Sequence, residues 1–506
     1  MTGNDDYMAF KALADQLDND ATHDRTGSGP HPAVRLVTDT DAAPARVVKG
    51  PGDPLPNART FLNATYNQDG RELLVHWQGT WHAWDGRCWP ELDRRTLSRD
   101  LYAFFDTAIF YKSGPRGGST PKETPFQPTR NKVADLLHAL EAVVHLPADT
   151  DAPSWTINDP PAPADELLPC ANGLLHLPTR RLLDHDPRLF NLHAVPFAHD
   201  PNATCPRWET FLGQLWPDDP QSIAAVQEMF GYLVSGDTRL QKAFFLVGPK
   251  RSGKGTIGRV ATALIGPADV AGPSMGAFAS HFGLSALIGK RLAIVGDARI
   301  RANDDEIVQR VLSIVGEDVI DVDRKHRDPW HGRLPTRLLL LSNELPSLVD
   351  SSGALASRFV LLRLTRSFIG KEDHHLEDTL VAELPGILNW ALDGMDRLRR
   401  RGRFVIPDSS LELMTQLEDL ASPISAFVRD RCTVDPMATV SCDTLYIAWR
   451  RWCADEGRTH PGKAATFGKD LFAAFPQVSK SRPRAADGNR TWTYTGIGLP
   501  GSQEAL

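Results

Sequence analysis

"FFLVGPKRSGKGTIGRV" spans Phe244 to Val260 and joins an apolar run to a glycine-rich, basic turn. The apolar run predicts a strand over Ala243–Val247, and the residues after the turn predict a helix over Thr256–Leu264. Glycines between a strand and a helix let backbone N–H groups face phosphates, and a lysine there reaches the terminal phosphates. The stretch therefore predicts a nucleotide-binding loop of Gly248, Pro249, Lys250, Arg251, Ser252, Gly253, Lys254, Gly255 and Thr256.

One position of the loop departs from the usual pattern. Gly255 stands where a serine or threonine hydroxyl ordinarily helps to hold Mg²⁺. We predict Thr256 as the residue that supplies this oxygen, with a water molecule as the alternative. Without the usual hydroxyl the pattern is weak by itself, so its interpretation depends on residues further along the chain.

Three polar residues flank later apolar segments. Asp297 follows a strand predicted at Leu292–Val295, where a carboxylate can hold the water shell of Mg²⁺. Asn343 follows a strand predicted at Leu338–Leu341, where an amide can orient water and sense the terminal phosphate. Arg358 precedes another strand and could reach the phosphate on a neighbouring subunit. Singly, these are also turn-forming residues and a solvated arginine. Their joint order predicts an ATPase core with Asp297, Asn343 and Arg358 as catalytic residues.

A basic turn lies in the stretch DVIDVDRKHRDPWHG. Strands are predicted at Val319–Val322 and Leu338–Leu341, and a basic tip between two strands is suited to phosphate contacts. The residues of the turn are Arg324, Lys325, His326 and Arg327. A solvated charged loop is the alternative, because three nearby carboxylates dilute the charge.

The composition is that of a folded protein without extreme charge. With 506 residues the chain is long enough for roughly three to five domains. A net charge of −7 excludes a uniformly basic surface, so any nucleic-acid contact has to be local. The cysteines form no C-x-x-C pair, and no signal peptide or membrane-spanning run is found. We expect a cytoplasmic protein without a membrane partner.

These segments together resemble the superfamily 3 helicases, a branch of the AAA+ ATPases. The closer resemblance is to the phage and plasmid primase–helicase family, which is related to the poxvirus primase–helicase. Five blocks in one order are similar to that family within about residues 165 to 410: ANGLLHLPTRRLLDHDP, GPKRSGKGTIGRV, IVGDARI, LPTRLLLLSNELP and DSSGALASRFVLLRL. The segment IDVDRKH, followed by a strand ending in Ser-Asn, is similar to the pore hairpin of papillomavirus and polyomavirus replicative helicases.

The resemblance implies ATP and Mg²⁺ as cofactors, a hexameric ring, and translocation on single-stranded or forked DNA, typically 3′ to 5′. By this resemblance, Lys254 would bind phosphate and Asp297 would be the acid that holds magnesium. Asn343 would be the sensor, and Arg358 would be the arginine finger. Arg363 and Arg366 are the alternatives for the finger. The DNA contacts are carried over to Lys325 and His326, with Arg324 beside them.

Two features of the family are not matched. Many superfamily members have two adjacent acids at the magnesium site, whereas Gly296 and Ala298 flank a lone Asp297, so the residue that activates water stays open. Family members often carry a primase, but the clearest early D-x-D, Asp39 with Asp41, lies in a low-complexity stretch. We expect no primase activity here, and a separate primase and other replication proteins as partners in a bacterial host cell.

The region before the loop is expected to hold an arm and one domain. Residues 1–55 are rich in Asp, Pro, Gly and Ala, which predicts a mostly disordered arm with a short helix near Phe10–Leu17. Residues 56–205 are the predicted α+β accessory domain of the primase–helicase type. Four of its tryptophans lie close together in the sequence and are interpreted as a sheet core, with a base-stacking platform as the alternative; they are Trp77, Trp81, Trp84 and Trp89.

The remaining chain divides into four predicted parts. Residues 206–236 are a helical oligomerisation segment, 237–370 the ATPase core, 371–415 a helical segment and 416–506 a winged-helix DNA-binding domain. The last part shows two amphipathic helices before a basic hairpin. A helical lid with a solvated loop is the alternative. The basic residues predicted to contact DNA are Lys480, Arg482, Arg484 and Arg490.

The predicted fold class is α/β, with an AAA+ phosphate-loop core between an α+β region and a winged helix. The predicted function is an ATP-dependent replicative DNA helicase of a phage, prophage or plasmid. An origin-binding initiator or ATP switch without processive unwinding is the alternative, and a motor that acts on RNA is a third possibility.

Overall fold

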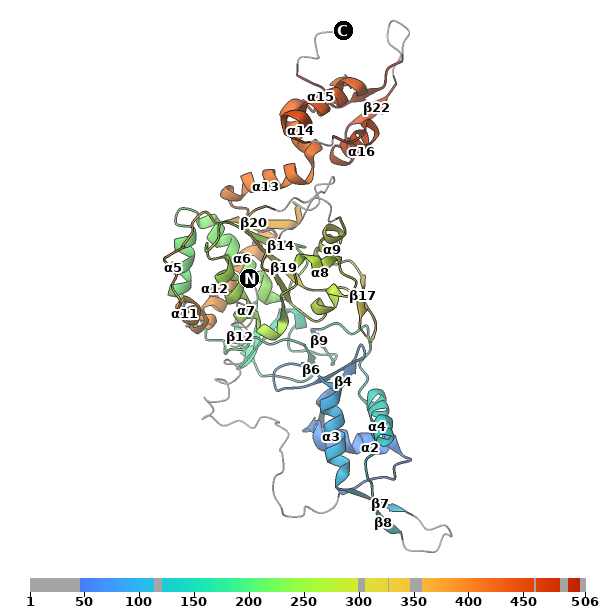
Figure 1. The fold of residues 1–506 in the computed structure, drawn as a ribbon. Coiled ribbons are helices and arrows are strands. Elements are labelled where there is room, and N and C mark those ends of the chain that lie inside the picture. Colours follow the sequence, from blue (N-terminus) through green and yellow to red (C-terminus); the bar gives the residue numbers. More distant parts are fainter. Residues whose placement is uncertain are drawn as a thin grey trace. The chain divides into compact units, whose positions relative to one another are not determined.

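The computed structural model describes residues 46–112, 121–298, 305–325, 327–345, 357–458, 461–482 and 490–500. The chain divides into two compact units, the first ending at His199 and the second beginning at Asp200 (Figure 1). This division lies shortly before the boundary predicted after residue 205. No helix in the described part of the chain is both long and apolar enough to cross a lipid bilayer.

The first unit combines helices with short sheets. Its described helices are α2 (Pro54–Thr65), α3 (Arg94–Asp106), α4 (Arg130–Val143) and the single turn η1 (Ala164–Glu166). One antiparallel sheet contains β4 (Leu74–Trp77), β5 (Thr80–Ala83) and β6 (Glu91–Leu92). A second contains β10 (Leu167–Cys170), β11 (Gly173–His176) and β12 (Arg181–Leu183). Two-stranded pairs are β2 (Asn67–Gln68) with β3 (Arg71–Glu72), and β9 (Ser154–Trp155) with β13 (Leu189–Phe190).

The predicted disordered arm ends earlier than residue 55. β1 (Arg46–Val47) pairs in parallel with β7 (Ala108–Lys112), which pairs antiparallel with β8 (Lys122–Pro125). Val48 is buried, and α2 begins at Pro54. The prediction was wrong for residues 46–55, because their few apolar side chains find partners distant in the sequence. The helix predicted near Phe10–Leu17 lies outside the described residues.

The four tryptophans predicted as a sheet core pack in the interior of the first unit. Trp81, Trp84 and Trp89 are each at most 9% exposed, and Trp77 packs against the same small cluster as Trp84 and Phe190. The interpretation of these residues as a sheet core is confirmed by their burial, because a stacking platform needs an exposed ring face.

A parallel sheet of five strands forms the centre of the second unit (Figure 1). Its strands, in spatial order, are β15 (Val270–Ala271), β16 (Leu292–Val295), β19 (Arg337–Ser342), β14 (Ala243–Val247) and β20 (Phe359–Arg363). The strands predicted around the phosphate loop and before Asp297 are confirmed at their bounds. β19 extends the predicted strand at both ends. Because all neighbours are parallel, the carboxyl ends of the strands share one edge.

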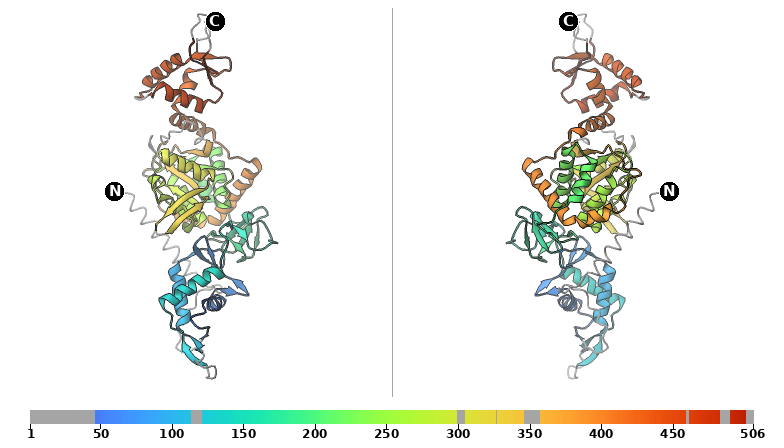
Figure 2. Two further views of the ribbon diagram at one scale, coloured as in Figure 1. Left: turned by 90° about the vertical axis from the view of Figure 1, so that its right-hand side faces the viewer. Right: turned by 90° about the vertical axis from the view of Figure 1, so that its left-hand side faces the viewer.

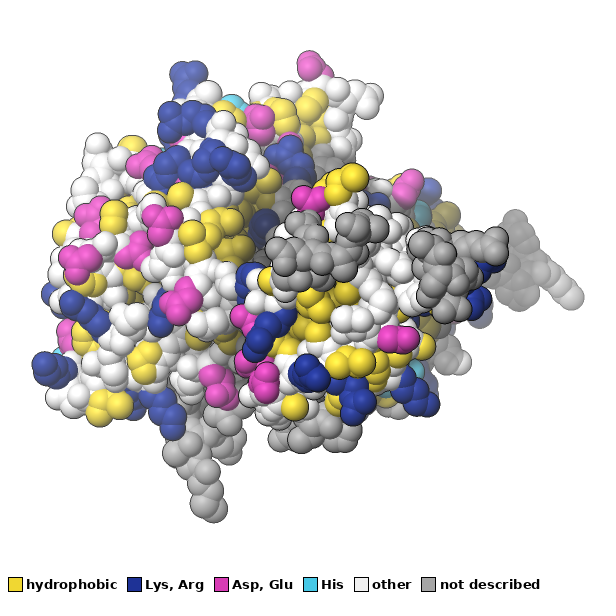
Figure 3. Space-filling view, turned by 90° about the horizontal axis from the view of Figure 1, so that it is seen from above, with side chains coloured by type: hydrophobic (Ala, Val, Ile, Leu, Met, Phe, Trp, Pro, Cys, Tyr) yellow, Lys and Arg dark blue, Asp and Glu magenta, His cyan; other side chains and the backbone are white. Residues whose placement is uncertain are grey.

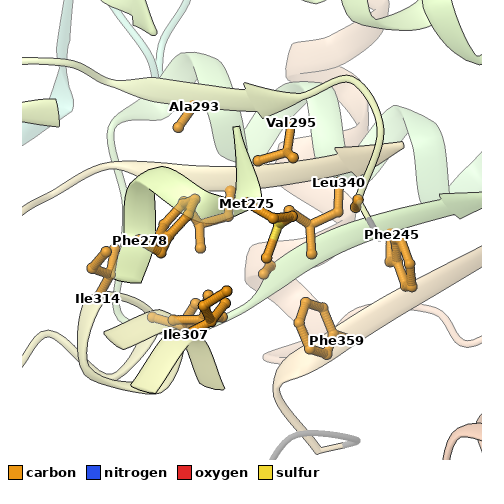
Figure 4. Packing of buried hydrophobic residues seen from close by; sticks show 14 of the residues in the cluster. Phe245, Met275, Phe278, Ala293, Val295, Ile307, Ile314, Leu340 and Phe359 are labelled. Atoms are coloured by element: carbon orange, nitrogen blue, oxygen red, sulfur yellow. The ribbon is translucent and has the colours of Figure 1, made fainter. Parts of the chain in front are cut away.

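Successive residues of β14 face two different helical layers. Phe245 belongs to the core cluster beneath α8 (Met275–Ala279) and α9 (Asp305–Gly316) (Figure 4). Phe244 points the other way, with its ring centroid 6.1 Å from that of Tyr232. The short turns η2 (Pro267–Asp269) and η3 (Gly283–Leu287) border β15 and β16. Buried apolar area of this kind is the main source of the stability of the sheet.

The layer that faces Phe244 contains the helices on both sides of the phosphate loop. They are α5 (Pro206–Leu215), α6 (Pro220–Ser235), α7 (Lys254–Ile265), α11 (Leu376–Ala382) and α12 (Leu384–Arg401). The single helical pattern predicted from Pro206 is two helices, because prolines interrupt it. α6 and α12 cross closely, since a Cβ at Gly231 would lie only 2.4 Å from the Ala391 carbonyl oxygen.

A separate hairpin stands beside the sheet. β17 (Ile320–Arg324) pairs antiparallel with β18 (Arg327–Gly332), and this pair forms its own sheet. The sequence prediction joined the basic turn directly to the strand before Asn343, which was wrong. β18 intervenes because the residues up to Gly332 fold back onto β17 before β19 begins.

The C-terminal part has the predicted pair of helices and the hairpin (Figure 2). α13 (Asp408–Ala421) runs across the boundary predicted between residues 415 and 416. The following elements are α14 (Pro423–Arg431), β21 (Thr439–Ser441), α15 (Cys442–Asp455), α16 (Ala464–Ala474), β22 (Ser479–Ser481) and β23 (Thr493–Thr495). The three strands pair in the order β21, β23, β22, and Trp449, Trp452 and Phe467 pack in the core beneath them.

Candidate nucleotide site

The phosphate loop joins the end of β14 to the start of α7. Gly253, the residue before α7, has a φ of 91°, and Arg251 has a φ of 58°. Both values lie in the left-handed region, which glycine adopts without strain. No side chain caps the N-terminus of α7, so the first N–H groups of this helix are available to a ligand. Such a helix start is a general anion-binding device.

Lys254 occupies the first position of α7 and is 8% exposed. Its Nζ donates to the carbonyl oxygens of Gly248 (2.7 Å) and Pro249 (2.8 Å) and to Ser252 Oγ (3.2 Å). A fourth contact joins Nζ to Asn343 Oδ1 at 3.3 Å. Burial lowers the pKa of Lys254. The sequence-predicted lysine and asparagine are thus brought into direct contact.

Asp297 lies at the same edge of the sheet. It follows β16, and the N–H of the next residue, Ala298, donates to the Leu341 carbonyl oxygen in β19 at 3.0 Å. This bond holds the segment containing Asp297 beside the end of the strand that delivers Asn343. The three predicted residues Lys254, Asp297 and Asn343 therefore share the carboxyl edge, as the parallel sheet requires.

The oxygen atoms at this edge fit a magnesium ion in their chemistry. Mg²⁺ prefers carboxylate and hydroxyl oxygens together with substrate phosphates, and Asp297 and Thr256 offer one of each. Thr256 Oγ1 accepts a long hydrogen bond from Arg259 Nη2, at 3.4 Å. Arg259 is also held by Glu377 of α11. Thr256 carries a hydroxyl on the residue that follows Gly255 in the helix, so its role as the missing magnesium ligand stays a prediction.

Arg358 lies at the opposite edge of the sheet. It precedes Phe359, which pairs with Ala243 at the start of β14, whereas Arg363 pairs with Val247 at its end. Five strand residues at about 3.3 Å each put roughly 16 Å between the backbones of Arg358 and Arg363. Arg358 donates to Gln241 Oε1. The structure therefore does not bring Arg358 to the phosphate loop of its own chain.

Two alternatives for the arginine finger lie near the loop instead. Arg363 and Asn343 line a pocket of about 440 Å³ at the carboxyl edge, which also includes Gly248, Pro249, Leu413 and Gln416. Arg366, further along, donates to the Gln214 carbonyl oxygen at 3.4 Å. No local signal in the sequence indicates that α13 borders this pocket, because α13 is far from the loop along the chain.

Only part of the predicted basic tip is described. Arg324 ends β17, and Lys325 is exposed with its Nζ 5.7 Å from the centre of the Phe282 ring. His326 lies outside the described residues. Two carboxylates of β17 are engaged by histidines, Asp321 by His331 at 2.6 Å and Asp323 by His281 at 3.2 Å. Both carboxylates near Lys325 therefore already have a partner within the chain.

The C-terminal hairpin presents cations over an exposed aromatic ring. Lys480 Nζ lies 4.9 Å and Arg482 Cζ 5.6 Å from the centre of the Trp492 ring, which belongs to a side chain 48% exposed. Arg490 is also exposed, and Arg484 lies outside the described residues. The sequence indicated these cations but not Trp492, although the position of Trp492 next to a basic hairpin was a signal that could have been used.

On the face drawn in Figure 3, Lys and Arg side chains lie among Asp and Glu, in keeping with local rather than uniform basic charge.

Two family models match separate parts of the chain. Residues 60–217 match the model described as "D5 N terminal like". Residues 246–358 match the model described as "Family of unknown function (DUF5906)". The second range begins within β14 and ends at Arg358, so it includes the loop, Asp297 and Asn343.

The chain is also similar to solved structures of the C-terminal region of NrS-1. One apo structure shares 11% identity over 84% of this chain and 95% of that chain, with a TM-score of 0.48. Another shares 11% identity over 88% of this chain and 99% of that chain, with a TM-score of 0.49. At this identity and with TM-scores under 0.5, these likenesses carry no functional inference.

Proposed function

We propose that this chain is an ATP-dependent DNA helicase that serves the replication of a phage, prophage or plasmid. The observation that carries the proposal is the setting of Lys254. A buried cation at the start of an uncapped helix lies at the positive end of the helix dipole, which disfavours it. A bound phosphate offsets both the burial and the dipole. The loop is therefore suited to the phosphate chain of a nucleotide.

The roles of the edge residues follow from this placement. Lys254 would bind the β- and γ-phosphates, and Asn343, already within 3.3 Å of its Nζ, would sense the γ-phosphate and orient water. Asp297 and Thr256 would hold Mg²⁺, which supplies charge stabilisation of the phosphates when bound. Arg358, at the far edge of the sheet, would act only on the nucleotide of a neighbouring subunit. That placement supports a ring, and we propose a hexamer.

The DNA side of the proposal rests on two basic surfaces. Arg324, Lys325 and His326 at the β17–β18 hairpin would grip the phosphates of single-stranded DNA inside the ring. The cations near Trp492 would hold duplex DNA at a fork. Neither set reads sequence through phosphate contacts. Cytoplasmic action in a bacterial host, with a separate primase, belongs to the same proposal.

The test is steady-state ATP turnover with and without single-stranded DNA, in parallel with fork unwinding. A helicase should show DNA-stimulated turnover and separate the strands, with 3′ to 5′ polarity on tailed substrates. Turnover that stays slow whatever DNA is present would contradict the motor. Stimulation by single-stranded RNA alone would instead indicate an RNA motor.

A second function is favoured by the C-terminal hairpin. The exposed Trp492 with Lys480 and Arg482 over its ring is a surface that can bind DNA without any motor action. In that case ATP would order assembly at an origin, and the protein would act as an initiator or switch. Nucleotide-dependent binding to duplex DNA without unwinding would support this function over the first.

A further inference from the structure

Arg363 is the described arginine closest in the sheet to the start of the phosphate loop. It pairs with Val247, the last residue of β14, in the neighbouring strand. Its backbone is fixed on two sides, because its carbonyl oxygen accepts from Trp216 Nε1 at 2.6 Å and the next N–H, of Leu364, donates to the Val247 carbonyl oxygen at 2.8 Å. The side chain therefore starts from a rigid point beside the loop.

The side chain of Arg363 borders the pocket at the carboxyl edge. The same pocket is lined by Gly248 and Asn343, and Asn343 in turn contacts Lys254. Lysine in such a loop reaches the β- and γ-phosphates. The pocket is thus the space next to the position at which a terminal phosphate would be held.

One carboxylate engages Arg363 in this structure. Arg363 Nη1 donates to Glu412 Oε2 at 2.9 Å, and the two side chains are 39% and 66% exposed. Exposed pairs of this kind contribute little stability. A phosphate offers more charge and a better match to the arginine fork, so it can displace Glu412 at little cost.

Glu412 belongs to a helix that is anchored by its first turns. Leu413 of α13 is buried in the core cluster of the sheet. The Asp408 N–H donates to Gln221 Oε1 at 2.7 Å, and Ser409 Oγ donates to Asp219 Oδ2 at 2.5 Å. Glu412 therefore presents its carboxylate to Arg363 from a fixed helix start, while the later residues of α13 lead towards α14.

We propose that Arg363 contacts the terminal phosphate of a nucleoside triphosphate bound in its own chain, and that Glu412 is a positioning residue that holds Arg363 when only a diphosphate is bound. This inference rests on the proposed nucleotide site and adds to it a means of telling ATP from ADP.

The experiment measures the dissociation constants of ADP and of the non-hydrolysable analogue AMP-PNP, both with Mg²⁺, for the full chain and its variants. Arg363→Ala should weaken AMP-PNP binding about tenfold, the loss expected for one charge-assisted contact, and leave ADP binding within about twofold. Glu412→Gln should tighten AMP-PNP binding severalfold without changing ADP binding. Arg399→Ala, which removes an exposed arginine of α12 that does not line the pocket, is the matched control and should change neither.

A double variant separates positioning from simple repulsion. If Glu412 acts through Arg363, the Glu412→Gln effect disappears in the Arg363→Ala background. If it persists there, Glu412 repels phosphate directly and the positioning role is wrong. Equal loss of both nucleotides in Arg363→Ala, or loss of neither, overturns the phosphate contact while the site itself stands. An unmodified chain that binds neither nucleotide overturns the proposed function and this inference together.

Discussion

The amino and carboxyl edges of the central sheet carry buried cations in opposite settings. At the amino edge, where Arg291 precedes β16 and Arg337 begins β19, Arg291 Nη2 donates to the Val234 carbonyl oxygen at 2.5 Å and Arg337 Nη2 to the Asp237 carbonyl oxygen at 2.9 Å. These carbonyls lie at the C-terminus of α6, the negative end of its dipole. At the carboxyl end, Lys254 begins α7 and lies at a positive end.

Burial acts in the same direction at both ends. It lowers the pKa of Arg291 and brings that of Arg337 to about 10, and it also lowers the pKa of Lys254. Carbonyl oxygens accept from all three cations: those of Val234 and Asp237 from the arginines, and those of Gly248 and Pro249 from Lys254. The difference is the helix end beside the charge, because the arginines lie at the negative end of α6 and Lys254 lies at the positive start of α7, which favours an anion. Burial of a cation alone therefore does not distinguish a structural role from a ligand-binding role, but the end of the helix beside it does.

The largest effect is expected for Lys254→Ala, which removes the buried cation at the carboxyl edge of the sheet. Loss of the charge on the β- and γ-phosphates should lower ATP turnover by on the order of a thousandfold. The fold should remain, because Lys254 is not part of the buried apolar core of the sheet. Turnover is measured alongside thermal unfolding, with Lys371→Ala, an exposed lysine, as the control. Normal turnover by a folded Lys254→Ala chain would remove the site assignment.

The second prediction concerns Arg358, which lies at the amino edge of the sheet and is proposed to act on the nucleotide of a neighbouring subunit. We expect Arg358→Ala to bind ATP normally and to lower turnover roughly a hundredfold, as for loss of one charge-stabilising donor. If it acts across subunits, mixtures with the unmodified chain should lose more activity than the mutant fraction. Activity that falls only in proportion to that fraction would argue against a shared site and would favour Arg366.

Arg337→Met tests the structural side of the comparison. It would leave the carbonyl oxygens of Asp237 and Pro335 without their donor, and we expect a loss of about 2–4 kcal/mol in the free energy of unfolding. Urea unfolding measures this loss, and the exposed Arg333→Met is the control. Lys254→Met also removes a donor from two carbonyl oxygens, those of Gly248 and Pro249. We expect it to abolish the stabilisation that a bound nucleotide gives, which Arg337→Met should leave in place. Loss of that stabilisation in both variants would show that the two edges of the sheet do not differ in the way described.

The smallest expected effect is at the β17–β18 hairpin. Lys325→Ala should keep basal turnover and assembly, lose DNA stimulation, and lower the salt slope of DNA binding by roughly one unit or less for one phosphate contact. The same is expected of His326→Ala. If both variants unwind a fork at the rate of the unmodified chain, the hairpin is only a charged surface loop, and other residues hold the DNA.

Local patterns were enough for the elements that build the nucleotide site. Ala243–Val247 and Leu292–Val295 are continuous apolar runs bounded by polar residues, and a buried parallel strand needs that pattern. The loop glycines and Lys254 are adjacent in the chain, so their spacing alone predicts their contact. The contact between Lys254 and Asn343 could be anticipated because the loop of Lys254 follows β14 and Asn343 follows β19, and neighbouring parallel strands share their carboxyl edge.

Other features depend on pairings that no local pattern encodes. The register of β20 against β14 decides that Arg363, and not Arg358, lies beside the loop. The pairing of Arg46 with Ala108 makes a strand from residues that read as disordered. β17 and β18 pair with each other and not with the central sheet, and the sequence of neither strand alone indicates this choice of partner.

The amino-acid sequence by itself determined a parallel α/β core with a phosphate loop, since hydrophobic period and glycine spacing act over a few residues. Only the tertiary structure decided which arginine meets the loop, that Glu412 of α13 holds it, and that Arg291 and Arg337 lie at a helix C-terminus. Each of these depends on strand order, register and helix packing. Such features arise from contacts between residues that are tens of positions or more apart in the sequence. These contacts form only when the whole core packs, so no short stretch of sequence encodes them.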